Sequence, residues 1–262
     1  MTGVMMTDWN AQHYSQFLDE RTRPAKELLA RIAHHQAHHI TDLGCGPANS
    51  TELLYKNWSN AHIIGVDSSA NMIAAAKATL PQVQFIQADF NIWQTDTPQD
   101  VIFANASLQW ATRHDKLLPQ LIGQLAPEGV LAIQMPDNLG EPSHRLIRET
   151  ADSPKWRGKM QGLPVRPDLP DAADYYDILT QAGCRTDIWR TAYYHVLPDV
   201  HSIVQWFGST ALRPYLNALD DTERTEFAAD YTSRLQQAYP PRADGRILLT
   251  LPRLFVVAEK TA

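Results

Sequence analysis

Apolar residues in the first half of the chain form short runs that alternate with stretches of helical periodicity. Residues 23–33 place Leu28, Leu29 and Ile32 on one helical face, with Pro24 at the first helical position. After a strand that ends at Leu43, the pattern predicts helices over 49–58, 70–80 and 114–126 and strands over 61–67, 83–89, 100–105 and 129–135. This alternation predicts βαβ units, a parallel sheet and right-handed crossovers.

The pattern changes beyond Met135. Residues 136–170 are rich in proline, glycine and charge, which predicts a loop with a short helix. A helix is predicted over 172–183, where Gly183 provides a C-terminal stop. The second half therefore does not continue the βαβ rhythm.

Two β-rich segments, 184–197 and 246–260, flank a helical stretch of about 50 residues. Pro252 predicts a bulge or an edge position within the second of these strands. In the helical stretch, apolar residues recur every four positions and predict one buried helix face: Phe227, Tyr231 and Leu235. We find no internal repeat and no low-complexity linker.

Composition and charge narrow the possible functions. A chain of 262 residues fits one elaborated α/β domain, and a net charge of -6 disfavours a duplex nucleic-acid partner. The N-terminus lacks the features of a signal peptide, and no run approaches the roughly 20 apolar residues that cross a bilayer. Two cysteines, Cys45 and Cys184, provide neither a disulfide framework nor metal-ligand spacing. We therefore expect a cytoplasmic protein with no membrane partner.

The segment "TDLGCGPANS", residues 41–50, joins a strand to a helix N-terminus through two glycines. Such a turn lets a ligand approach the backbone, with N–H groups and the helix dipole directed outward. The dinucleotide fingerprint requires G-x-G-x-x-G, but Asn49 occupies the third glycine position, and Pro47 has no N–H to offer a pyrophosphate. The loop therefore favours a ligand without a phosphate over NAD.

Two acidic residues follow the next strands. Asp67 lies 21 residues after Gly46, where a carboxylate can accept hydrogen bonds from both ribose hydroxyls of an adenosine. Asp89 ends the segment "VQFIQAD", where an acid can meet the adenine amino group. Either carboxylate could instead cap a following helix. Their order and register with the glycine turn favour a site for an adenosine ligand.

With "DLGCGPANST", "GVDSS", "QADF" and "FANASLQW" in order and at the usual spacing, the chain resembles the class I S-adenosylmethionine-dependent methyltransferases. The resemblance covers most of the first 135 residues. It implies an α/β, Rossmann-like sheet of seven strands, mostly parallel with an antiparallel last strand, and a helical lid insertion. It also implies S-adenosyl-L-methionine as the cofactor, S-adenosyl-L-homocysteine as its product, and no metal.

The resemblance assigns cofactor-binding residues along one edge of the sheet. The methionine part would lie over Gly44 and Gly46, while Asp42 would orient the loop or meet the methionine ammonium group. Asp67 would hold the ribose, and Asp89 would flank the adenine. The full implied set is Asp42, Gly44, Gly46, Asp67, Ser68, Met72, Asp89, Phe90, Asn105 and Ala106.

One position departs from the family pattern. Ala48 stands where the family's loop commonly has a third small residue, a glycine. An alanine methyl group is tolerated there if its φ angle is negative. Cys45, between the two glycines, has neither a base nor a second thiol near it in the sequence, so we interpret it as chosen for size rather than reactivity.

We expect a single methyltransferase domain over 1–262 and divide it by expected role. An N-terminal segment containing Trp9, Tyr14 and Arg21 would fold over the cofactor as a lid, or pack as a helix on the sheet edge. The expected parts are a helical lid at 1–33, the cofactor-binding core at 34–135, a loop and helix at 136–183, and the last strands at 184–262 with a helical insertion at 199–240 that covers the substrate.

The substrate class follows from the second half of the chain. Enzymes that methylate exocyclic base nitrogens have [DN]-P-P-[YFW] after the fourth strand, whereas this chain reads "NASL" at 105–108, which disfavours such a substrate. The segments "NASLQW", "QMPDN", "YYDIL", "DIWRT", "LRPYL" and "PRLFVVA", and the start "DWN", are similar to the bacterial methyltransferases that esterify trans-aconitate. This resemblance runs over nearly the whole chain and implies a small tricarboxylate substrate.

Esterification of a carboxylate requires residues that bind and position the substrate rather than a general acid or base. The carboxylate is already ionised at neutral pH, its pKa lying about three units below, so no general base is required. The two carboxylates that are not methylated need cationic or hydrogen-bonding partners, for which arginine forks are suited. The candidate anchors are Arg190, Arg213 and Arg253. Beside Arg190 on the same strand, Tyr193 and His195 face one side and Tyr194 faces the other. Gln109 and Trp110 would position the acceptor carboxylate. Trp110 could instead be core.

Three other interpretations stay open. A methyltransferase for another acid or a phenol would need a base, for which His195 or His114 would serve. A protein that binds S-adenosylmethionine without turnover would show tight cofactor binding and no transfer, and an NAD-linked oxidoreductase is the least favoured.

The run "HHQAHH" at 34–39 lacks carboxylate or cysteine support for a metal site, and we interpret it as a solvated helix end. The sequence sets no expectation for oligomeric state.

Overall fold

The structure is a computed structural model that describes residues 18–33, 35–208 and 210–261, without the side chains of residues 18–21. Trp9 and Tyr14 of the expected N-terminal lid lie outside the described residues, as does the side chain of Arg21.

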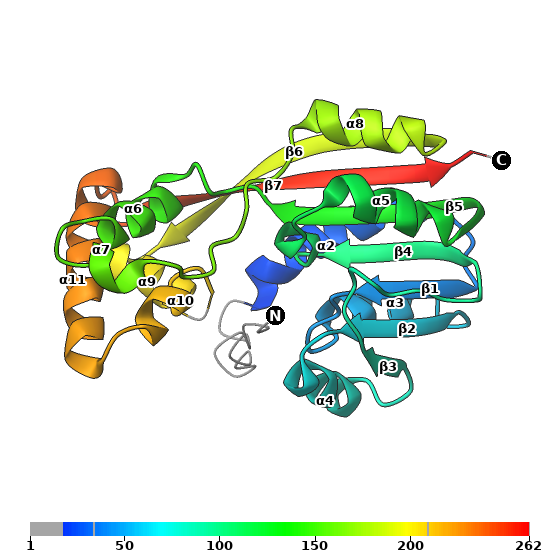
Figure 1. Cartoon of the computed structure of the whole chain (residues 1–262), viewed down its shortest axis with the longest axis horizontal. Coiled ribbons are helices and arrows are strands. Elements are labelled where there is room, and N and C mark those ends of the chain that lie inside the picture. The colour runs from blue at the N-terminus through cyan, green and yellow to red at the C-terminus, as the bar shows by residue number, and fades with distance from the viewer. Residues whose placement is uncertain (1–17, 34, 209, 262) are drawn as a thin grey trace. The chain divides into compact units, whose positions relative to one another are not determined.

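A seven-stranded sheet has the strand order β3-β2-β1-β4-β5-β7-β6. Its strands are β1 (His39–Leu43), β2 (His62–Asp67), β3 (Gln84–Gln87), β4 (Gln99–Asn105), β5 (Leu125–Pro136), β6 (Cys184–Leu197) and β7 (Ile247–Lys260). Strands β1 to β5 pair in parallel, and β7 runs against β5, as the arrows in Figure 1 show. The expected mostly parallel sheet with an antiparallel last strand is confirmed.

The helices also follow the predicted order. Four of them, α3, α4, α5 and α8, lie within one to three residues of the predicted ranges. The described helices are α2 (Leu18–Ile32), α3 (Asn49–Asn57), α4 (Ala70–Thr79), α5 (His114–Gly123), α6 (Pro142–Ala151), α7 (Arg157–Met160), α8 (Ala172–Gln181), α9 (Val200–Gly208), α10 (Arg213–Asn217) and α11 (Asp221–Ala238). None of the described helices is long and apolar enough to span a bilayer.

Two local predictions were wrong, and a third was wrong in one of its alternatives. Pro24 lies inside α2 rather than at its first position, so the helix proceeds without one backbone hydrogen bond. Residues 35–39 of the histidine run do not end a helix, because α2 ends at Ile32 and His39 already belongs to β1. For Pro252 the edge position is excluded, because β7 lies between β5 and β6, and a bulge stays a prediction. The Pro252 carbonyl accepts a hydrogen bond from the Asp137 N–H at 3.0 Å.

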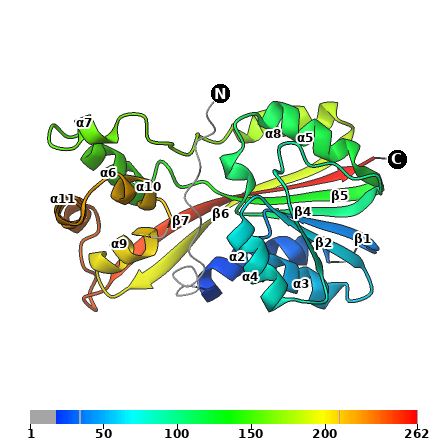
Figure 2. The same ribbon diagram turned by 60° about the horizontal axis from the view of Figure 1, so that its bottom comes forward.

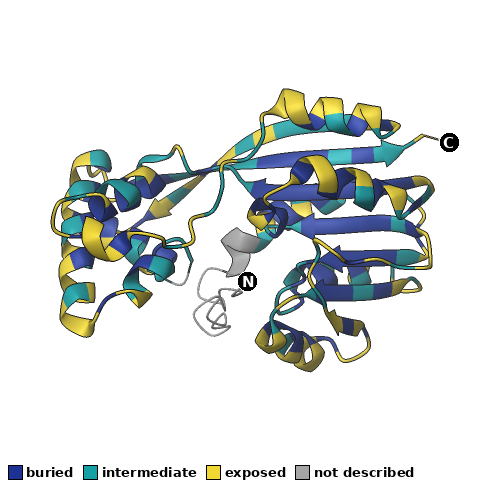
Figure 3. Cartoon of the chain, in the orientation of Figure 1, coloured by how far each residue is buried: buried dark blue, intermediate teal, exposed yellow. Residues whose placement is uncertain are grey.

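The chain divides into two compact units. The first contains residues 1–135, 169–190 and 254–262, and the second contains 136–168 and 191–253. In the first unit, helices cover both faces of the sheet, with α5 and α8 on one face and α2, α3 and α4 on the other (Figure 2). The central strands are buried along most of their length, as the dark strands in Figure 3 show.

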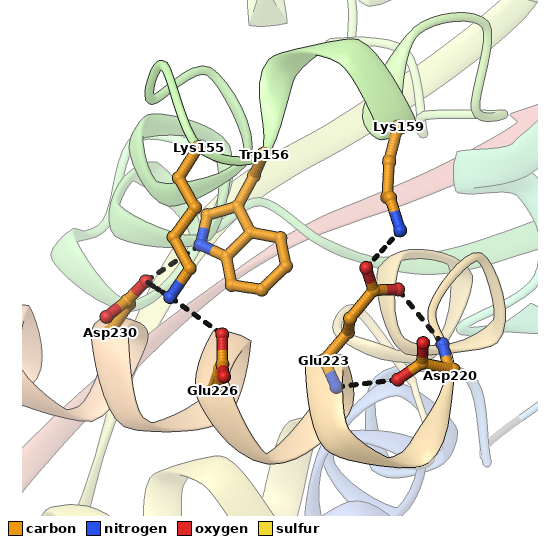
Figure 4. Close-up of polar contacts among 7 residues, drawn as sticks. All are labelled: Lys155, Trp156, Lys159, Asp220, Glu223, Glu226 and Asp230. Carbon is orange, nitrogen blue, oxygen red and sulfur yellow. Dashed lines mark hydrogen bonds and ion pairs between the residues drawn. The ribbon is translucent and has the colours of Figure 1, made fainter.

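The second unit has its own core around α11. Phe227, Tyr231 and Leu235 have no exposed surface, so the predicted buried face is confirmed. The Trp156 ring is 2% exposed and lies 5.4 Å from the ring of Phe227. Its indole N–H donates to an Asp230 carboxylate oxygen at 2.8 Å (Figure 4). Burial of these aromatic side chains is the main stabilisation of this unit.

Charged residues support the same contact from the surface. The Lys155 ammonium lies 3.1 Å from Glu226 and 3.3 Å from Asp230, and Lys159 pairs with Glu223 (Figure 4). The α11 N-terminus carries a capping box, in which Asp220 and Glu223 each accept the other's backbone N–H. Each of these exposed ion pairs contributes little to the free energy of unfolding, but together they connect residues 155–159 to residues 223–230 of α11.

Candidate active site

The glycine loop after β1 is held against β2 and the end of β4. The N–H groups of Gly44 and Cys45 both donate to the Val66 carbonyl, at 2.7 and 3.0 Å. Gly44 has a φ of 74°, and a Cβ added to it would lie 2.2 Å from the Cβ of Ser107. Ser107 itself is fixed, because its hydroxyl donates to the Leu43 carbonyl at 2.6 Å. Gly44 is therefore required both by conformation and by close approach.

Gly46 and Ala48 also have left-handed backbone conformations. Gly46 has a φ of 54°, and a Cβ built on it would meet nothing within 4 Å. Ala48 has a φ of 78°, so the negative φ that would have accommodated its methyl group without strain is not present. The alanine stands in a conformation that glycine adopts more readily, at a cost of roughly 1–2 kcal/mol.

Asp42 is fully buried beneath this loop. One of its carboxylate oxygens accepts hydrogen bonds from the hydroxyls of Ser50 at 2.8 Å and Thr51 at 2.7 Å, both in α3. The other oxygen, Oδ1, has no partner among the described residues. Burial raises the pKa of Asp42 to about 6, against the lowering effect of the two hydroxyls, and the charge of Asp67 raises it further. Asp42 thus links the strand end to α3 and retains one acceptor.

We expect Asp42→Asn to stabilise the cofactor-free protein by about 3 kcal/mol at pH 7. The folded-state pKa of about 6 exceeds the ordinary value of 3.8, so the folded state binds this proton more tightly than the unfolded state, and stability falls as pH rises from about 4 to about 6. Asparagine removes this loss and retains an oxygen for Ser50 and Thr51. Urea unfolding of both proteins at pH 4 and pH 7 measures the difference, which should be near zero at the lower pH. An equal difference at both values contradicts the assignment.

Asp67 connects the glycine loop to the end of β2. Its two carboxylate oxygens accept the N–H of Gly46 at 3.0 Å and the N–H of Ser69 at 2.9 Å. Ser69, not Asp67, is the N-cap of α4, since its hydroxyl accepts the Met72 N–H at 3.3 Å. The alternative role of Asp67 as a helix cap is therefore wrong. Ser68 is exposed at this turn, and Met72 is buried, 5% exposed.

Asp89 is exposed at the turn after β3 and caps no helix. One of its carboxylate oxygens accepts the backbone N–H of Asn91 at 2.9 Å and its side-chain amide at 2.8 Å. Phe90 is half-buried and packs against the hydrophobic core of the first unit. The carboxylate of Asp89 remains accessible to solvent beside an apolar ring, which suits the predicted position of an adenine edge.

Buried polar atoms without a described partner gather at the end of β4 and in the turn after it. Asn105 Oδ1 is one of them, and Asn105 is paired in register with Gln134, whose Nε2 is another. The Gln109 side-chain amide donates to the Ala106 carbonyl at 2.7 Å, which leaves its Oε1 without a described partner. Ala106 has a φ of 53°. Buried polar groups of this kind cost free energy unless a ligand or water satisfies them.

Trp110 and the histidines differ in their surroundings. Trp110 is 37% exposed, so its alternative interpretation as a core residue is wrong. His114 is buried, with its Nδ1 3.1 Å from the Tyr175 hydroxyl, and desolvation lowers its pKa. His195 is half-buried, and its ring lies 4.8 Å from the ring of Trp206. His114 is thus a neutral core histidine with a fixed partner, which argues against its use as a general base.

Cys45 is buried, and its pKa is raised above the ordinary range by desolvation and then by the charges of Asp42 and Asp67. Its sulfur lies 3.1 Å from where a Cβ on Gly65 would stand. This close packing supports the interpretation that its size, and not its reactivity, suits the loop.

The predicted substrate residues fall in both units. Arg190 is exposed and belongs to the first unit, whereas Arg213, the first residue of α10, and Arg253, in β7, belong to the second. In β6 the side chains alternate as predicted, because Tyr193 is 3% exposed and Tyr194 is 62% exposed. The structure describes the two units separately, so these arginines are not brought together as one set.

A group of second-unit residues was missed by the sequence analysis: Asn138, His144, Arg148 and Arg166. Arg166 donates to the Asn138 side-chain oxygen at 3.0 Å, and Arg148 donates to the Leu139 carbonyl at 2.8 Å. A signal was present on α6, where a histidine and an arginine four residues apart lie on or beside the face that buries Ile147. No periodicity marks Arg166, which lies in an irregular segment.

The fold and the loop define a class of protein that comparison with known families identifies. A family model described as a methyltransferase domain matches residues 34–183, and the chain belongs to this family. Its relatives include proteins named trans-aconitate 2-methyltransferase. That of Yersinia pestis (strain Pestoides F) is 49% identical over 97% of this chain and 99% of the relative, and that of Rhodopseudomonas palustris (strain BisB18) is 48% identical over 97% and 100%.

Solved structures support the fold. The YcgJ protein of Bacillus subtilis is similar with a TM-score of 0.59 and 14% identity, over 92% of this chain and 99% of that one. A phosphoethanolamine N-methyltransferase of Haemonchus contortus, solved in complex with S-adenosyl-L-methionine, has a TM-score of 0.55 and 17% identity, over 92% of this chain and 53% of that one. At these identities the likeness extends to the fold alone.

Proposed function

We propose that the protein transfers the methyl group of S-adenosyl-L-methionine to a carboxylate of trans-aconitate, which yields the monomethyl ester and S-adenosyl-L-homocysteine. The substrate rests on the names of relatives that are 48–49% identical along almost the whole chain. The cofactor rests on family membership and on the chemistry of the strand ends of the first unit.

The observation that carries the cofactor assignment is the kind of polar atom left without a described partner near these strand ends. Of the four such atoms, Asp42 Oδ1, Asn105 Oδ1 and Gln109 Oε1 are hydrogen-bond acceptors, and the fourth, Gln134 Nε2, is a donor. A phosphate needs donors, whereas the ammonium, ribose hydroxyl and adenine amino groups of S-adenosylmethionine are donors. Buried acceptors therefore fit this cofactor and disfavour a dinucleotide.

Different residues along these strand ends would bind the methionine, the ribose and the adenine of the cofactor. Gly44 and Gly46 would lie under the methionine, with the free acceptor of Asp42 toward its ammonium group. Asp67 would accept the ribose hydroxyls, and Asp89 with Phe90 would flank the adenine. Ser68, Met72, Asn105 and Ala106 would complete the wall of the site.

The reaction needs no proton transfer. The bound cofactor supplies an electrophilic methyl group on a positively charged sulfur. A carboxylate oxygen forms a bond to that methyl carbon while the carbon–sulfur bond breaks and sulfur keeps the electron pair. Charge is neutralised in this step, so a closed, water-poor site favours it, and the protein acts by in-line positioning. Gln109 and Trp110 would position the acceptor carboxylate.

Mass spectrometry of the products tests this proposal. Purified protein is incubated with S-adenosyl-L-methionine and, separately, trans-aconitate, cis-aconitate, citrate and isocitrate. We expect a monomethyl ester that forms at least about 10-fold faster from trans-aconitate than from the others, since one bidentate carboxylate contact contributes about that much discrimination.

The controls separate the parts of the proposal. Omitting the cofactor should abolish the product, and a rate that is flat between pH 6.5 and 8.5 is expected because no base titrates there. Cofactor binding without any ester would contradict the substrate and retain the fold. A rate that rises through neutral pH on a phenol would favour a base such as His195 instead.

A further inference from the structure

We propose that Arg148, Arg166 and Arg253 of the second unit form an anion site that binds carboxylate groups of a small tricarboxylate. This inference rests on the proposed function and names residues that bind its substrate. It assigns two arginines that the sequence analysis did not find and retains one that it did.

Two of the three arginines donate to one short segment, Asp137–Leu139, and the third follows directly after a residue whose carbonyl pairs with that segment. Arg166 donates to the Asn138 side chain at 3.0 Å, and Arg148 donates to the Leu139 carbonyl at 2.8 Å. The Asp137 N–H donates to the carbonyl of Pro252, the residue directly before Arg253. All these residues belong to the same compact unit. Three guanidinium groups that come from α6, an irregular segment and β7 thus share one neighbourhood.

Arg166 is the clearest sign of a missing anion. Its Nε is buried and has no hydrogen-bond partner, and among the described residues it forms no ion pair. Burial lowers the pKa of Arg166 to about 10, and the charges of Arg253 and Arg148 contribute to this lowering. Arg166 as a whole is half-buried, and its buried Nε is costly without an acceptor. Its remaining fork is suited to a carboxylate.

His144 shows that the three positive charges act together. It is 7% exposed, and its ring lies 4.6 Å from the ring of Phe207. Burial and then the charges of Arg166, Arg148 and Arg253 lower the pKa of His144 to about 3. The imidazole is therefore neutral at pH 7 and adds no charge. Its Nδ1 lies 3.3 Å from the Ser143 hydroxyl.

Two carboxylates also lie near Arg166. Asp137 and Asp168 raise its pKa, although less than burial and Arg253 lower it. Neither forms a hydrogen bond or an ion pair with the Arg166 Nε, which is buried without a described partner. A carboxylate of the substrate would provide that acceptor.

The test compares Arg166→Gln with the matched control Arg145→Gln. Arg145 is also in the second unit, but it is exposed and pairs with Glu149 on the surface of α6. We expect Arg166→Gln to raise KM for trans-aconitate about 30- to 100-fold and to change the dissociation constant of S-adenosyl-L-homocysteine less than threefold. Arg145→Gln should leave both within twofold. A KM within twofold of the parent, in a folded Arg166→Gln protein, overturns the proposal.

Thermal unfolding separates a binding role from a structural one. Without ligand, Arg166→Gln should be at least as stable as the parent, because it removes a buried charge beside two others, whereas a structural arginine would lower the melting temperature when replaced. If this variant fails to fold, Arg253→Gln provides the same comparison of KM. Trans-aconitate should stabilise the parent protein and not the variant.

The binding measurement also distinguishes the two proposals. If the parent protein forms no ester but is stabilised by trans-aconitate, and Arg166→Gln removes that stabilisation, the proposed reaction fails and the anion site stands. If ester forms and Arg166→Gln is kinetically unchanged, the reaction stands and the anion site is overturned. If trans-aconitate neither reacts nor stabilises the parent, both fail.

Discussion

Gly44→Ala is expected to destabilise the protein by about 2–5 kcal/mol, a large fraction of the 5–15 kcal/mol typical of a folded protein. A φ of 74° contributes roughly 1–2 kcal/mol of strain for a residue with a Cβ. The new methyl carbon would lie 2.2 Å from the Cβ of Ser107, and Ser107 cannot move without breaking its hydrogen bond to Leu43. Relieving such overlap costs a further 1–3 kcal/mol or so. Urea unfolding measures the loss directly.

Gly46→Ala is the matched control for this prediction. Gly46 has a φ of 54°, and a Cβ built there meets nothing within 4 Å, so only the backbone strain of about 1 kcal/mol applies. The variant should fold and should bind S-adenosyl-L-methionine less tightly, because its methyl group enters the space assigned to the cofactor. Equal destabilisation by the two substitutions would show that strain, and not contact with Ser107, makes Gly44 necessary.

Asp67→Ala is expected to raise the dissociation constant of S-adenosyl-L-homocysteine at least about 100-fold. Two hydrogen bonds from ribose hydroxyls to a carboxylate are each worth about 1.5–3 kcal/mol. The substitution also removes the acceptor for the Gly46 N–H, which positions the loop. Isothermal titration calorimetry measures the affinity, and circular dichroism confirms the fold.

Two further variants make this result specific. Asp67→Asn retains an oxygen for one backbone N–H and should lose about 10-fold in affinity. Asp96→Ala removes an exposed acid of the first unit and should change nothing. Parent-like cofactor affinity in Asp67→Ala would remove Asp67 from the ribose.

The sequence predicted the sheet well because each strand is short, apolar and bounded by turn residues. The range 184–197 was correct at both ends, since its β-branched and aromatic residues follow directly after Gly183. Pro24 shows the limit of local signals. Proline favours the first turn of a helix, but packing of the α2 residues Leu28 and Ile32 against the core permits it in the interior.

The position of the glycine loop could be predicted because its signal is local. Strand, glycines and helix follow one another within about ten residues, and Asp67 ends the next strand. For Ala48 the sequence allowed only a conditional prediction, that its methyl group is tolerated if φ is negative. The folded loop sets this φ angle at 78°.

The residues of the proposed anion site could not be predicted in the same way. Arg148 and Arg166 are separated by α7 and irregular segments, and their contacts with residues 138 and 139 exist only in the fold. Surface arginines are common and most of them are solvated, so composition does not identify these two. The buried Nε of Arg166 distinguishes it from the exposed Arg190.

The acceptors near the strand ends have a kinetic consequence under the proposed function. The ammonium, ribose and adenine groups that Asp42, Asp67 and Asp89 would bind are identical before and after methyl transfer. The protein therefore has few means to distinguish the spent cofactor from the fresh one. Turnover should respond to the ratio of the two forms, and removal of the spent form by other enzymes would set the pace of ester formation at low cofactor supply.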